Sequence, residues 1–389
     1  MEILLLGSGF VAAPCVEYLV PSRRLENAQA LAKQFPAEIE KLVAEHDVSI
    51  SLIPYIYHAL VIKAAVKHKK HVVTTSYVSP AMMEYDQAAK DAGITVMNEI
   101  GLDPGIDHLY AVKTIEELKE FISFCGGLPA PEDSNNPFGY KFSWSARGNT
   151  ARYLEKGKVV EVSGTALMDS AKKLNTGYPG LLSLATRYNI PEAETIIRGT
   201  MRYDGFCQFV KALVILGFLS EEEEAHFAAD AQDITWSQVL AKTVGINDTS
   251  AESLRAAIIA KCDLDNNDHK DQILDGMRWL GFFSNINVHR RGSLLDTFCA
   301  TLEDKMQYGE NERDLVFLQH RFEIELKDGS RQTRTSTLVE YGKVGGYSAM
   351  AKTVGLTATG VLAPMTNEIN EPIIELLEQE GIGMVERIL

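Results

Sequence analysis

Short apolar runs alternate with helical patterns over the first hundred residues of the chain. Residues 1–6 form an apolar run that ends at Gly7, and apolar positions then recur with helical spacing from residue 11 to residue 19. The same alternation continues with predicted strands over 47–53, 71–75 and 94–97 and predicted helices over 59–68 and 81–92. Strands and helices that alternate at this length are typical of a parallel sheet covered by helices on both faces.

Two strands of that sheet are missing from the pattern. The first helix is followed by Pro21 and by a second helical pattern over 25–35, and another helix begins at Ala37. Nothing between these helices is long enough for a strand, although parallel strands joined by helices need one. Either the protein lacks these two strands, or residues are missing from the printed sequence and its numbering closes over the gaps. We favour missing residues, because a sheet without these strands would leave helices with no face to bury against.

The pattern changes in the middle of the chain. Residues 121–129, 140–145 and 158–163 are predicted strands of a second sheet, which returns at 315–326 and 332–341. Asp328 and Gly329 between the last two strands are a strong hairpin signal.

Helical patterns dominate from residue 190 to residue 308. Ser220 with Glu223, and Thr249 with Glu252, have the spacing of capping boxes, and the acidic run over 221–224 is expected to be a solvated first turn. The sequence therefore predicts an α/β protein of three parts: a Rossmann-like domain (1–105, rejoined by 350–389), a second α/β domain (106–189 and 309–349) and an inserted all-α domain (190–308).

Composition narrows the class of protein. A chain of 389 residues with 46% hydrophobic residues has material for two or three buried cores. Its net charge of −15 argues against nucleic acid or an anionic membrane surface as the main partner. Five scattered cysteines without CxxC spacing, and the lack of a signal peptide or membrane-spanning run, favour a cytoplasmic protein.

The turn from Gly7 to Phe10 follows the first strand, where a dinucleotide's pyrophosphate binds in Rossmann folds. Ala12 replaces the third glycine of the usual fingerprint, and a strand, glycine turn and helix can also be purely structural. Arg23 and Arg24 fall where the adenosine ribose is expected. Because arginine pairs with a 2′-phosphate, they indicate NADP rather than NAD, although a solvated basic helix start is the common alternative.

A second dense stretch places Glu99, Asp103, Asp107 and His108 near a predicted strand end. An aspartate and a histidine so close can form an acid/base pair, but Asp-Pro-Gly also simply makes turns. A metal site is the weaker interpretation, because no HxxxH or DxD pattern occurs. Ligands of such parallel sheets bind in a crevice beyond the carboxyl ends of the strands. Cys125 ends another predicted strand beside that crevice, although a buried, inert thiol is the more frequent role of a cysteine.

Arg198 and Arg202 are four residues apart and share one face if their segment is helical. Two guanidinium groups suit a dicarboxylate substrate, although a surface salt-bridge pair explains such spacing more often. Residues 345–348 precede another predicted helix. They can hold an anion at the N-terminus of that helix or form a simple turn.

Several of these stretches together resemble the saccharopine reductases, the NADP-dependent, L-glutamate-forming saccharopine dehydrogenases of fungal lysine synthesis. The resemblance spans nearly the whole chain. The segments that carry it are Gly7-Ser-Gly-Phe-Val, Ile50-Ser-Leu-Ile-Pro-Tyr, His71-Val-Val-Thr-Thr-Ser-Tyr-Val-Ser-Pro, residues 98–110, Cys125-Gly-Gly-Leu-Pro-Ala-Pro, Tyr140-Lys-Phe-Ser-Trp and Gly346-Tyr-Ser-Ala-Met-Ala-Lys.

The resemblance implies that an imine of glutamate and aminoadipate semialdehyde is reduced by NADPH, in a homodimer and without a metal. It implies catalytic roles near the reacting carbon for Tyr77, Asp103 and Cys125, with no single general base. The implied substrate residues are Thr75, Ser76, Asp103, Thr200, Met201 and Arg202. The implied cofactor residues are Gly7, Ser8, Gly9, Phe10, Ser22, Arg23, Arg24, Leu52, Thr74, Thr75, Gly101, Leu102, Asp103 and Trp144.

The chain departs from the family in length. An Asn-Arg-Asp-Ser stretch, whose arginine binds saccharopine in the family, is expected between Leu184 and Tyr188 and is missing. Two rival functions therefore stay open. One is a carboxy-polyamine dehydrogenase or synthase on the same scaffold, whose diamine substrate would call for acidic groups where Arg198 and Arg202 stand. The other is a non-catalytic NADP-binding regulator.

Overall fold

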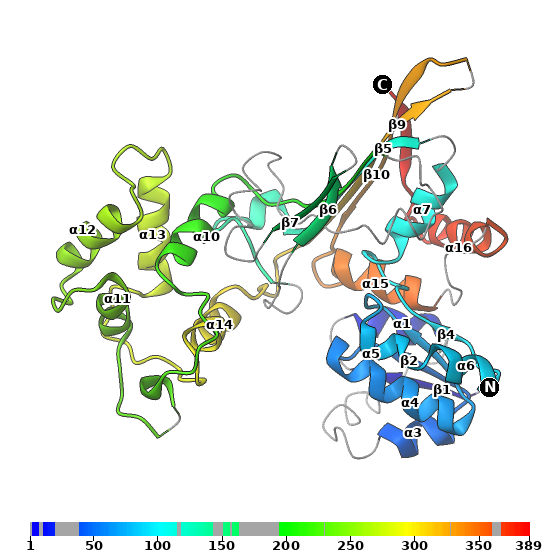
Figure 1. Ribbon diagram of the computed structural model, residues 1–389, viewed down its shortest axis with the longest axis horizontal. Helices are drawn as coiled ribbons and strands as arrows, with labels where there is room; N and C mark the ends of the chain where they lie inside the picture. Colours follow the sequence, from blue (N-terminus) through cyan, green and yellow to red (C-terminus); the bar gives the residue numbers. More distant parts are fainter. Residues whose placement is uncertain are drawn as a thin grey trace. The chain divides into compact units, whose positions relative to one another are not determined.

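The computed structural model describes residues 2–7, 11–19, 39–114, 118–142, 151–155, 158–162, 194–228, 230–326, 328–359 and 367–389 (Figure 1). It divides into two compact units. Unit 1 contains Met1–Cys125, Ser183–Ile196 and Leu315–Leu389, and unit 2 contains Gly126–Leu182 and Ile197–Asp314. The three-part division expected from the sequence stays a prediction.

Unit 1 contains a parallel sheet in the order β1-β2-β3-β4, which confirms the strands predicted there. The strands are β1 (Ile3–Leu6), β2 (Val48–Ser51), β3 (His71–Thr74) and β4 (Val96–Met97). β1 is an edge of the described sheet and pairs directly with β2, which comes after two helical segments in the chain. This order corresponds to the 1-4-5-6 half of a Rossmann sheet, in which the dinucleotide binds beyond the carboxyl end of the first strand. The second helical pattern, over 25–35, falls outside the described residues.

Side chains of the parallel sheet alternate between two apolar clusters. Leu4, Leu6 and Val72 belong to a cluster with α3 (Ile39–Glu45) and α4 (His58–His68). Ile50 and Val73 belong to a cluster with Cys15 of α1 (Ala12–Leu19) and Ala358 of α15 (Ala349–Thr359). The period of two along each strand therefore buries both faces, as a parallel sheet requires.

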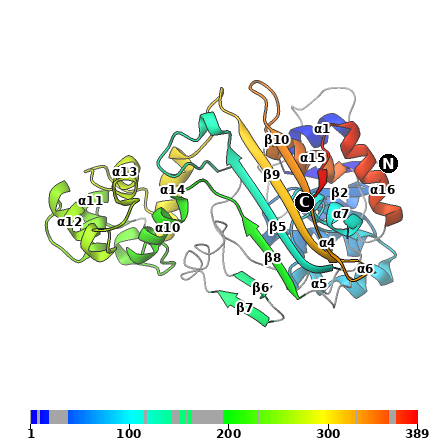
Figure 2. The same ribbon diagram turned by 90° about the horizontal axis from the view of Figure 1, so that it is seen from above.

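Helix α15 lies directly against α1 (Figures 1 and 2). A Cβ at Gly355 would lie only 2.6 Å from the carbonyl oxygen of Val11, so a side chain there would push the two helices apart. Ser348 caps α15 by accepting a hydrogen bond from the amide of Ala351, and this confirms the helix predicted after residues 345–348.

One predicted helix of unit 1 is wrong. Residues 81–92 form two helices, α5 (Pro80–Met83) and α6 (Asp86–Ala92), instead of one. Tyr85 separates them with φ −95° and ψ 0°, and its amide bonds to the carbonyl of Met82 in a tight turn. The apolar pattern continues through this turn, so periodicity alone did not indicate the break.

The second sheet has the strand order β11-β10-β9-β5-β8-β6-β7. β9 (Asp314–Glu325) and β10 (Arg331–Tyr341) form the predicted hairpin, with Gly329 at φ 81° in its turn. The other strands are β5 (Leu118–Pro129), β6 (Ala151–Glu155), β7 (Lys158–Val162), β8 (Thr195–Thr200) and β11 (Val385–Ile388). In unit 1, Val316 and Leu338 of this sheet share a core with Ile106 of α7 (Ile106–Thr114) and Leu377 of α16 (Asn367–Gln379).

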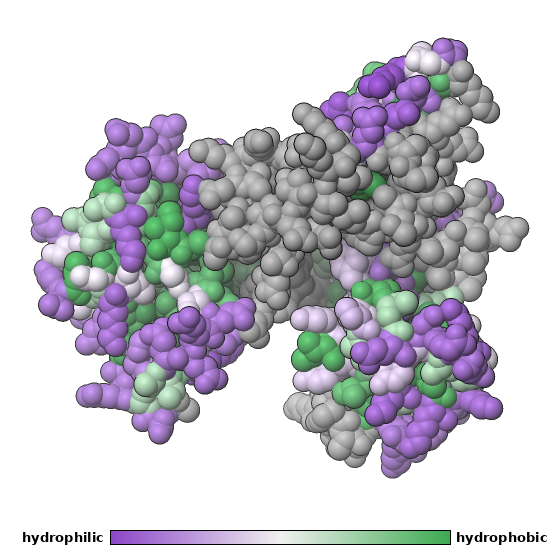
Figure 3. Space-filling model, viewed as in Figure 1, coloured by the Kyte–Doolittle hydropathy of each residue, from purple (hydrophilic) through white to green (hydrophobic). Residues whose placement is uncertain are grey.

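Helices dominate the rest of unit 2, as predicted. They are α10 (Phe206–Ile215), α11 (Trp236–Val244), α12 (Ala251–Lys261), α13 (Lys270–Leu280) and α14 (Leu294–Lys305). Phe218 stacks on Phe282 with ring centroids 4.4 Å apart, and Trp236 and Phe298 complete this aromatic core. Polar residues cover much of the visible surface of these helices in Figure 3, as amphipathic helices require.

Both predicted capping boxes are wrong. Residues 220–224 contain no helical turn, because Glu223 forms a bridge with Ser293. Helix α12 begins one residue later than expected, with Ser250 accepting from the amide of Ser253. The capping box that does form joins Thr235 and Gln238 at the start of α11.

The predicted strand over 140–145 is wrong in its described part. Asn136 bonds through its side-chain amide to the carbonyl of Tyr140, and the amide of Phe142 bonds to the carbonyl of Met306. A loop side chain and the end of α14 therefore satisfy backbone groups that a strand would have offered to a neighbour.

No described helix is long and apolar enough to cross a membrane.

Candidate active site

The glycine turn after β1 lies against the end of β2. Gly7 has φ +128°, and a Cβ there would lie 3.1 Å from both backbone and side-chain atoms of Leu52. The amide of Leu52 donates to the carbonyl of Leu6 at 2.8 Å. Only glycine fits this close approach at a positive φ, which is the backbone geometry that a bound pyrophosphate needs. Ser8, Gly9 and Phe10, which continue the turn, lie outside the described residues.

Two loops at the ends of β3 and β4 are joined by hydrogen bonds. Thr74 is buried and donates from Oγ1 to Asn98 Oδ1 at 3.2 Å, while the amide of Ile100 donates to the carbonyl of Thr74. A Cβ at Gly101 would lie 3.3 Å from the Cβ of Thr75, so these two predicted cofactor residues are neighbours.

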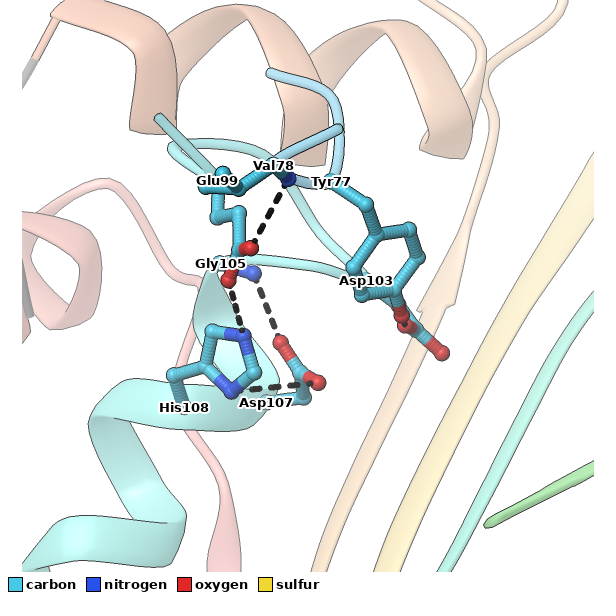
Figure 4. A network of polar contacts seen from close by, with 7 residues as sticks. All are labelled: Tyr77, Val78, Glu99, Asp103, Gly105, Asp107 and His108. Carbon is cyan, nitrogen blue, oxygen red and sulfur yellow. Dashed lines mark hydrogen bonds and ion pairs between the residues drawn. The ribbon is translucent and has the colours of Figure 1, made fainter. Parts of the chain in front are cut away.

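Tyr77 and Asp103 form a hydrogen-bonded pair between the same two loops (Figure 4). The Tyr77 hydroxyl donates to Asp103 Oδ1 at 2.6 Å, and the Tyr77 side chain is 42% exposed. An exposed phenol bonded to a carboxylate can pass a proton to or from a substrate. The structure thus brings together two of the three residues expected to be catalytic.

The remaining acidic residues of the second loop form a buried network (Figure 4). His108 donates from Nε2 to Glu99 Oε2 at 3.0 Å, and its Nδ1 lies 3.6 Å from Asp107 Oδ2. The side chains of all three residues are at most 3% exposed. Burial raises the pKa of Asp107 above its usual range. The close aspartate and histidine noted in the sequence, Asp107 and His108, are therefore buried within the protein.

Sequence reasoning missed a histidine beside this site. Nδ1 of His58 lies 2.9 Å from Ser51 Oγ, and its Nε2 lies 2.9 Å from Ser76 Oγ. Burial lowers the pKa of His58 to about 4, so the ring is neutral near pH 7. The one available signal was the position of a histidine just after a strand end, and its serine partners are not apparent from spacing.

Cys125 and Leu102 have side chains in an apolar core. Cys125 is 9% exposed and Leu102 is 3% exposed, and both belong to the cluster that includes Ile106. Leu102 accepts at its carbonyl a hydrogen bond from the amide of Asp107. The candidate thiol is therefore less accessible than the Tyr77–Asp103 pair.

The remaining substrate candidates lie in unit 2, and the segment that carries them begins as a strand and not as a helix. Arg198 and Arg202 are not on a helix face, because Arg198 lies in strand β8, which ends at Thr200. The β-branched run Thr-Ile-Ile before Arg198 favours a strand. A Cβ at Gly126 would lie 3.1 Å from the Cβ of Met201, so the chain packs tightly just after β8.

Arg202 is held by aromatic rings. Its Cζ lies 4.4 Å from the ring centroid of Tyr140 and 5.3 Å from that of Phe206, and its NH1 donates to the carbonyl of Met201 at 2.6 Å. The guanidinium is thus held by cation–π contacts as well as by a hydrogen bond. Ser22, Arg23, Arg24 and Trp144 lie outside the described residues.

A parallel Rossmann-type sheet and a glycine turn at its first strand are the architecture of a dinucleotide-binding protein, and the tyrosine–aspartate pair adds acid/base groups in the same unit. The comparisons with known proteins make it an NADP-dependent oxidoreductase. Residues 3–97 match the saccharopine dehydrogenase NADP binding domain, and residues 101–382 match the saccharopine dehydrogenase C-terminal domain. The chain belongs to the saccharopine dehydrogenase family.

Relatives match over almost their whole length. The "Saccharopine dehydrogenase [NADP(+), L-glutamate-forming]" of Pyricularia oryzae is 49% identical, over 100% of this chain and 99% of that protein. The protein of the same name from Saccharomyces cerevisiae is 48% identical over 99% of each chain. A solved structure of the apo, histidine-tagged yeast enzyme matches with a TM-score of 0.88 and 46% identity over 100% of both chains.

The alignment with the Pyricularia protein runs over 449 positions, more than the 389 residues of this chain. That relative therefore carries residues that this chain lacks, as the shortened segments in the sequence indicated.

Proposed function

We propose that this protein is an NADP-dependent, L-glutamate-forming saccharopine dehydrogenase. It condenses L-glutamate with L-2-aminoadipate 6-semialdehyde and reduces the imine to saccharopine, a step of lysine biosynthesis by the α-aminoadipate pathway. The observation that carries this proposal is the full-length identity of 48–49% to enzymes with that name. The Tyr77–Asp103 pair, in the loops that follow β3 and β4, supplies groups suited to the chemistry.

The residues at the end of β1 and β2 fit a dinucleotide. Gly7 and Leu52 bring two backbone segments together without an intervening side chain, and Thr75 and Gly101 border the neighbouring strand end. When bound, NADPH supplies the hydride that reduces the imine carbon. We assign Ser8, Gly9 and Phe10 to the pyrophosphate, Ser22, Arg23 and Arg24 to the 2′-phosphate, and Thr74, Leu102, Asp103 and Trp144 to the rest of the cofactor site.

The chemistry requires several proton transfers. The glutamate amine attacks the aldehyde carbon, the amine loses a proton, and the new hydroxyl leaves as water after it gains one. Asp103 can accept a proton and Tyr77 can donate one, and the bond between them lets one restore the other. Cys125 stays a third candidate near the reacting carbon.

Both substrates carry carboxylates, which need cationic or hydroxyl partners. We assign Thr75, Ser76, Asp103, Thr200, Met201 and Arg202 to substrate binding, as the resemblance of the sequence implies. The planar guanidinium of Arg202 suits a carboxylate, because the two groups can form parallel hydrogen bonds. A carboxy-polyamine dehydrogenase would instead need an acidic residue for its diamine.

Steady-state NADPH oxidation tests the reaction. We expect turnover with glutamate plus aminoadipate semialdehyde and none with a diamine in place of glutamate. No turnover, together with normal NADPH binding, would support the non-catalytic regulator instead.

Arg23 tests the cofactor. We predict that Arg23→Ala weakens NADPH binding by about tenfold to a hundredfold and leaves NADH binding nearly unchanged, because a charged hydrogen bond to phosphate contributes about 1.5–3 kcal/mol. Fluorescence titration with both nucleotides measures this. Equal losses for both would show that Arg23 does not contact the 2′-phosphate.

We also propose a cytoplasmic homodimer. The scattered cysteines fit a reducing compartment, and most oligomers of soluble proteins are symmetric dimers. Sedimentation equilibrium tests the assembly: a mass of one chain would exclude the dimer. Cell fractionation tests the compartment against the mitochondrial location stated in the name of the 37% identical mouse α-aminoadipic semialdehyde synthase, of which this chain spans about half the length.

A further inference from the structure

We propose that Glu99, together with His108, is a positioning residue that holds the Tyr77 hydroxyl against Asp103. The inference rests on the proposed function, because it assigns Tyr77 and Asp103 to the reaction. The dashed lines in Figure 4 join Glu99 to the amide of Val78 and to His108, so Glu99 acts on the backbone next to Tyr77.

Glu99 bonds to both neighbours of Tyr77. Its backbone amide donates to the carbonyl of Ser76 at 3.2 Å, and its Oε1 accepts from the amide of Val78 at 3.1 Å. The peptide groups on both sides of Tyr77 are therefore fixed by one residue of the second loop. This determines the direction in which the exposed phenol leaves the backbone.

The other oxygen of Glu99 connects to the turn that carries Asp103. Its Oε2 accepts from His108 Nε2 at 3.0 Å, and His108 lies in the first turn of α7. Asp107 beside it accepts at Oδ1 from the amide of Gly105 at 2.6 Å, and its own amide bonds to the carbonyl of Leu102. One buried carboxylate thus links the backbone of Tyr77 to the helix that fixes the Asp103 turn.

Two features of Glu99 are unfavourable for stability alone. It has φ +67°, a left-handed conformation that is uncommon for a residue with a long side chain, and its side chain is only 3% exposed. Burying a carboxylate beside a second one, Asp107, is costly even with histidine between them. An apolar pair would fill such a site at lower cost, so these features indicate a role in the geometry of the neighbouring pair.

A double-mutant cycle tests this proposal. We expect Glu99→Gln to lower kcat for saccharopine oxidation by about tenfold to a hundredfold, because a displacement of about 1 Å at a reacting group has that effect. The KM for saccharopine and the affinity for NADP should change less than about twofold, since Glu99 contacts neither in the proposal. In a Tyr77→Phe background the same substitution should have almost no further effect on kcat.

Two other variants complete the test. His108→Gln keeps an N–H donor for Glu99 and should retain more activity than Glu99→Gln; it also serves if the latter does not fold. Glu340→Gln is the matched control. It removes a carboxylate whose side chain is 15% exposed and which bonds to Lys352 Nζ at 2.8 Å, and it should leave kcat unchanged. Additive losses in the cycle, or an unchanged kcat in Glu99→Gln, would overturn the proposal.

A spectroscopic readout separates this inference from the proposed function. With 3-fluorotyrosine at position 77, the ¹⁹F resonance of the otherwise unchanged protein should show one environment, and Glu99→Gln should shift or broaden it. If the protein forms no saccharopine, the proposed function fails while this measurement still tests the positioning. If turnover is normal and the resonance does not respond to Glu99→Gln, the positioning role is wrong and the proposed function stands.

Discussion

Asp103 and Arg202 are two charged residues proposed for the same reaction, and the chain holds them in different ways. Asp103 is bonded to Tyr77 within a pair of loops joined by backbone hydrogen bonds. Arg202 lies over the rings of Tyr140 and Phe206. Hydrogen bonds fix direction, which proton transfer needs, whereas cation–π contacts with two rings hold a guanidinium in place, which suits carboxylate binding.

The largest expected effect on activity is that of changing Asp103. Asp103→Asn keeps the size of the side chain and an acceptor for the Tyr77 hydroxyl, but it removes the base. We expect kcat to fall by about 100-fold or more, the usual contribution of a positioned acid or base. The affinity for NADPH should be kept. Steady-state rates and fluorescence titration measure the two quantities, and normal turnover would remove Asp103 from the chemistry.

A fall in pH should lower the free energy of unfolding through His58, whose ring bonds to Ser76 next to Tyr77. Its pKa is about 4 in the folded protein and about 6.5 unfolded, so the unfolded state binds the extra proton between these values. His58 therefore contributes stability that is present above pH 6.5 and lost as the pH falls towards 4, by about 3 kcal/mol in total.

Urea unfolding at a series of pH values measures this contribution. In His58→Gln, whose amide can replace one of the bonds to serine, the free energy of unfolding should fall less between pH 6.5 and 4 than in the wild type. Parallel pH dependence in the two proteins would show that His58 does not titrate as the burial of its ring requires.

For Arg202 we expect a smaller effect, confined to substrate binding. Arg202→Leu should raise the KM for saccharopine by about tenfold, since a hydrogen bond to a charged group contributes about 1.5 kcal/mol or more. Arg202→Lys keeps the charge but loses the planar guanidinium that can bind a carboxylate through two parallel hydrogen bonds, so its KM should lie between those of the wild type and Arg202→Leu. Arg278→Leu, an exposed arginine paired with Asp275 in the same unit, is the control. A fall in kcat without a change in KM would contradict a binding role.

The strand ends of the parallel sheet could be predicted because their signals are local. Apolar runs that stop at Gly7 or Pro54 mark β1 and β2, and the loops after the strands follow from the rule that parallel strands end at one edge. The sequence also indicated that Glu99, Asp107 and His108 lie close together.

The roles within the site could not be predicted in this way. Glu99 bonds to Val78 and His58 bonds to Ser76, and both contacts join segments that are separated in the chain by at least one helix and one strand. The spacing of Arg198 and Arg202 could not decide between helix and strand, because residues four apart share a face in both. Arg202 contacts the ring of Tyr140, and Tyr140 lies in a segment that the apolar pattern predicts to be a strand.

Transfer of deuterium from NADPH to product tests the central claim most directly. The purified protein is incubated with glutamate, aminoadipate semialdehyde and NADPH that carries two deuterium atoms at C4, and the product is analysed by mass spectrometry. The proposed function predicts saccharopine with a single deuterium on the carbon that came from the aldehyde. Unlabelled saccharopine, or no saccharopine while NADPH binds normally, would contradict it.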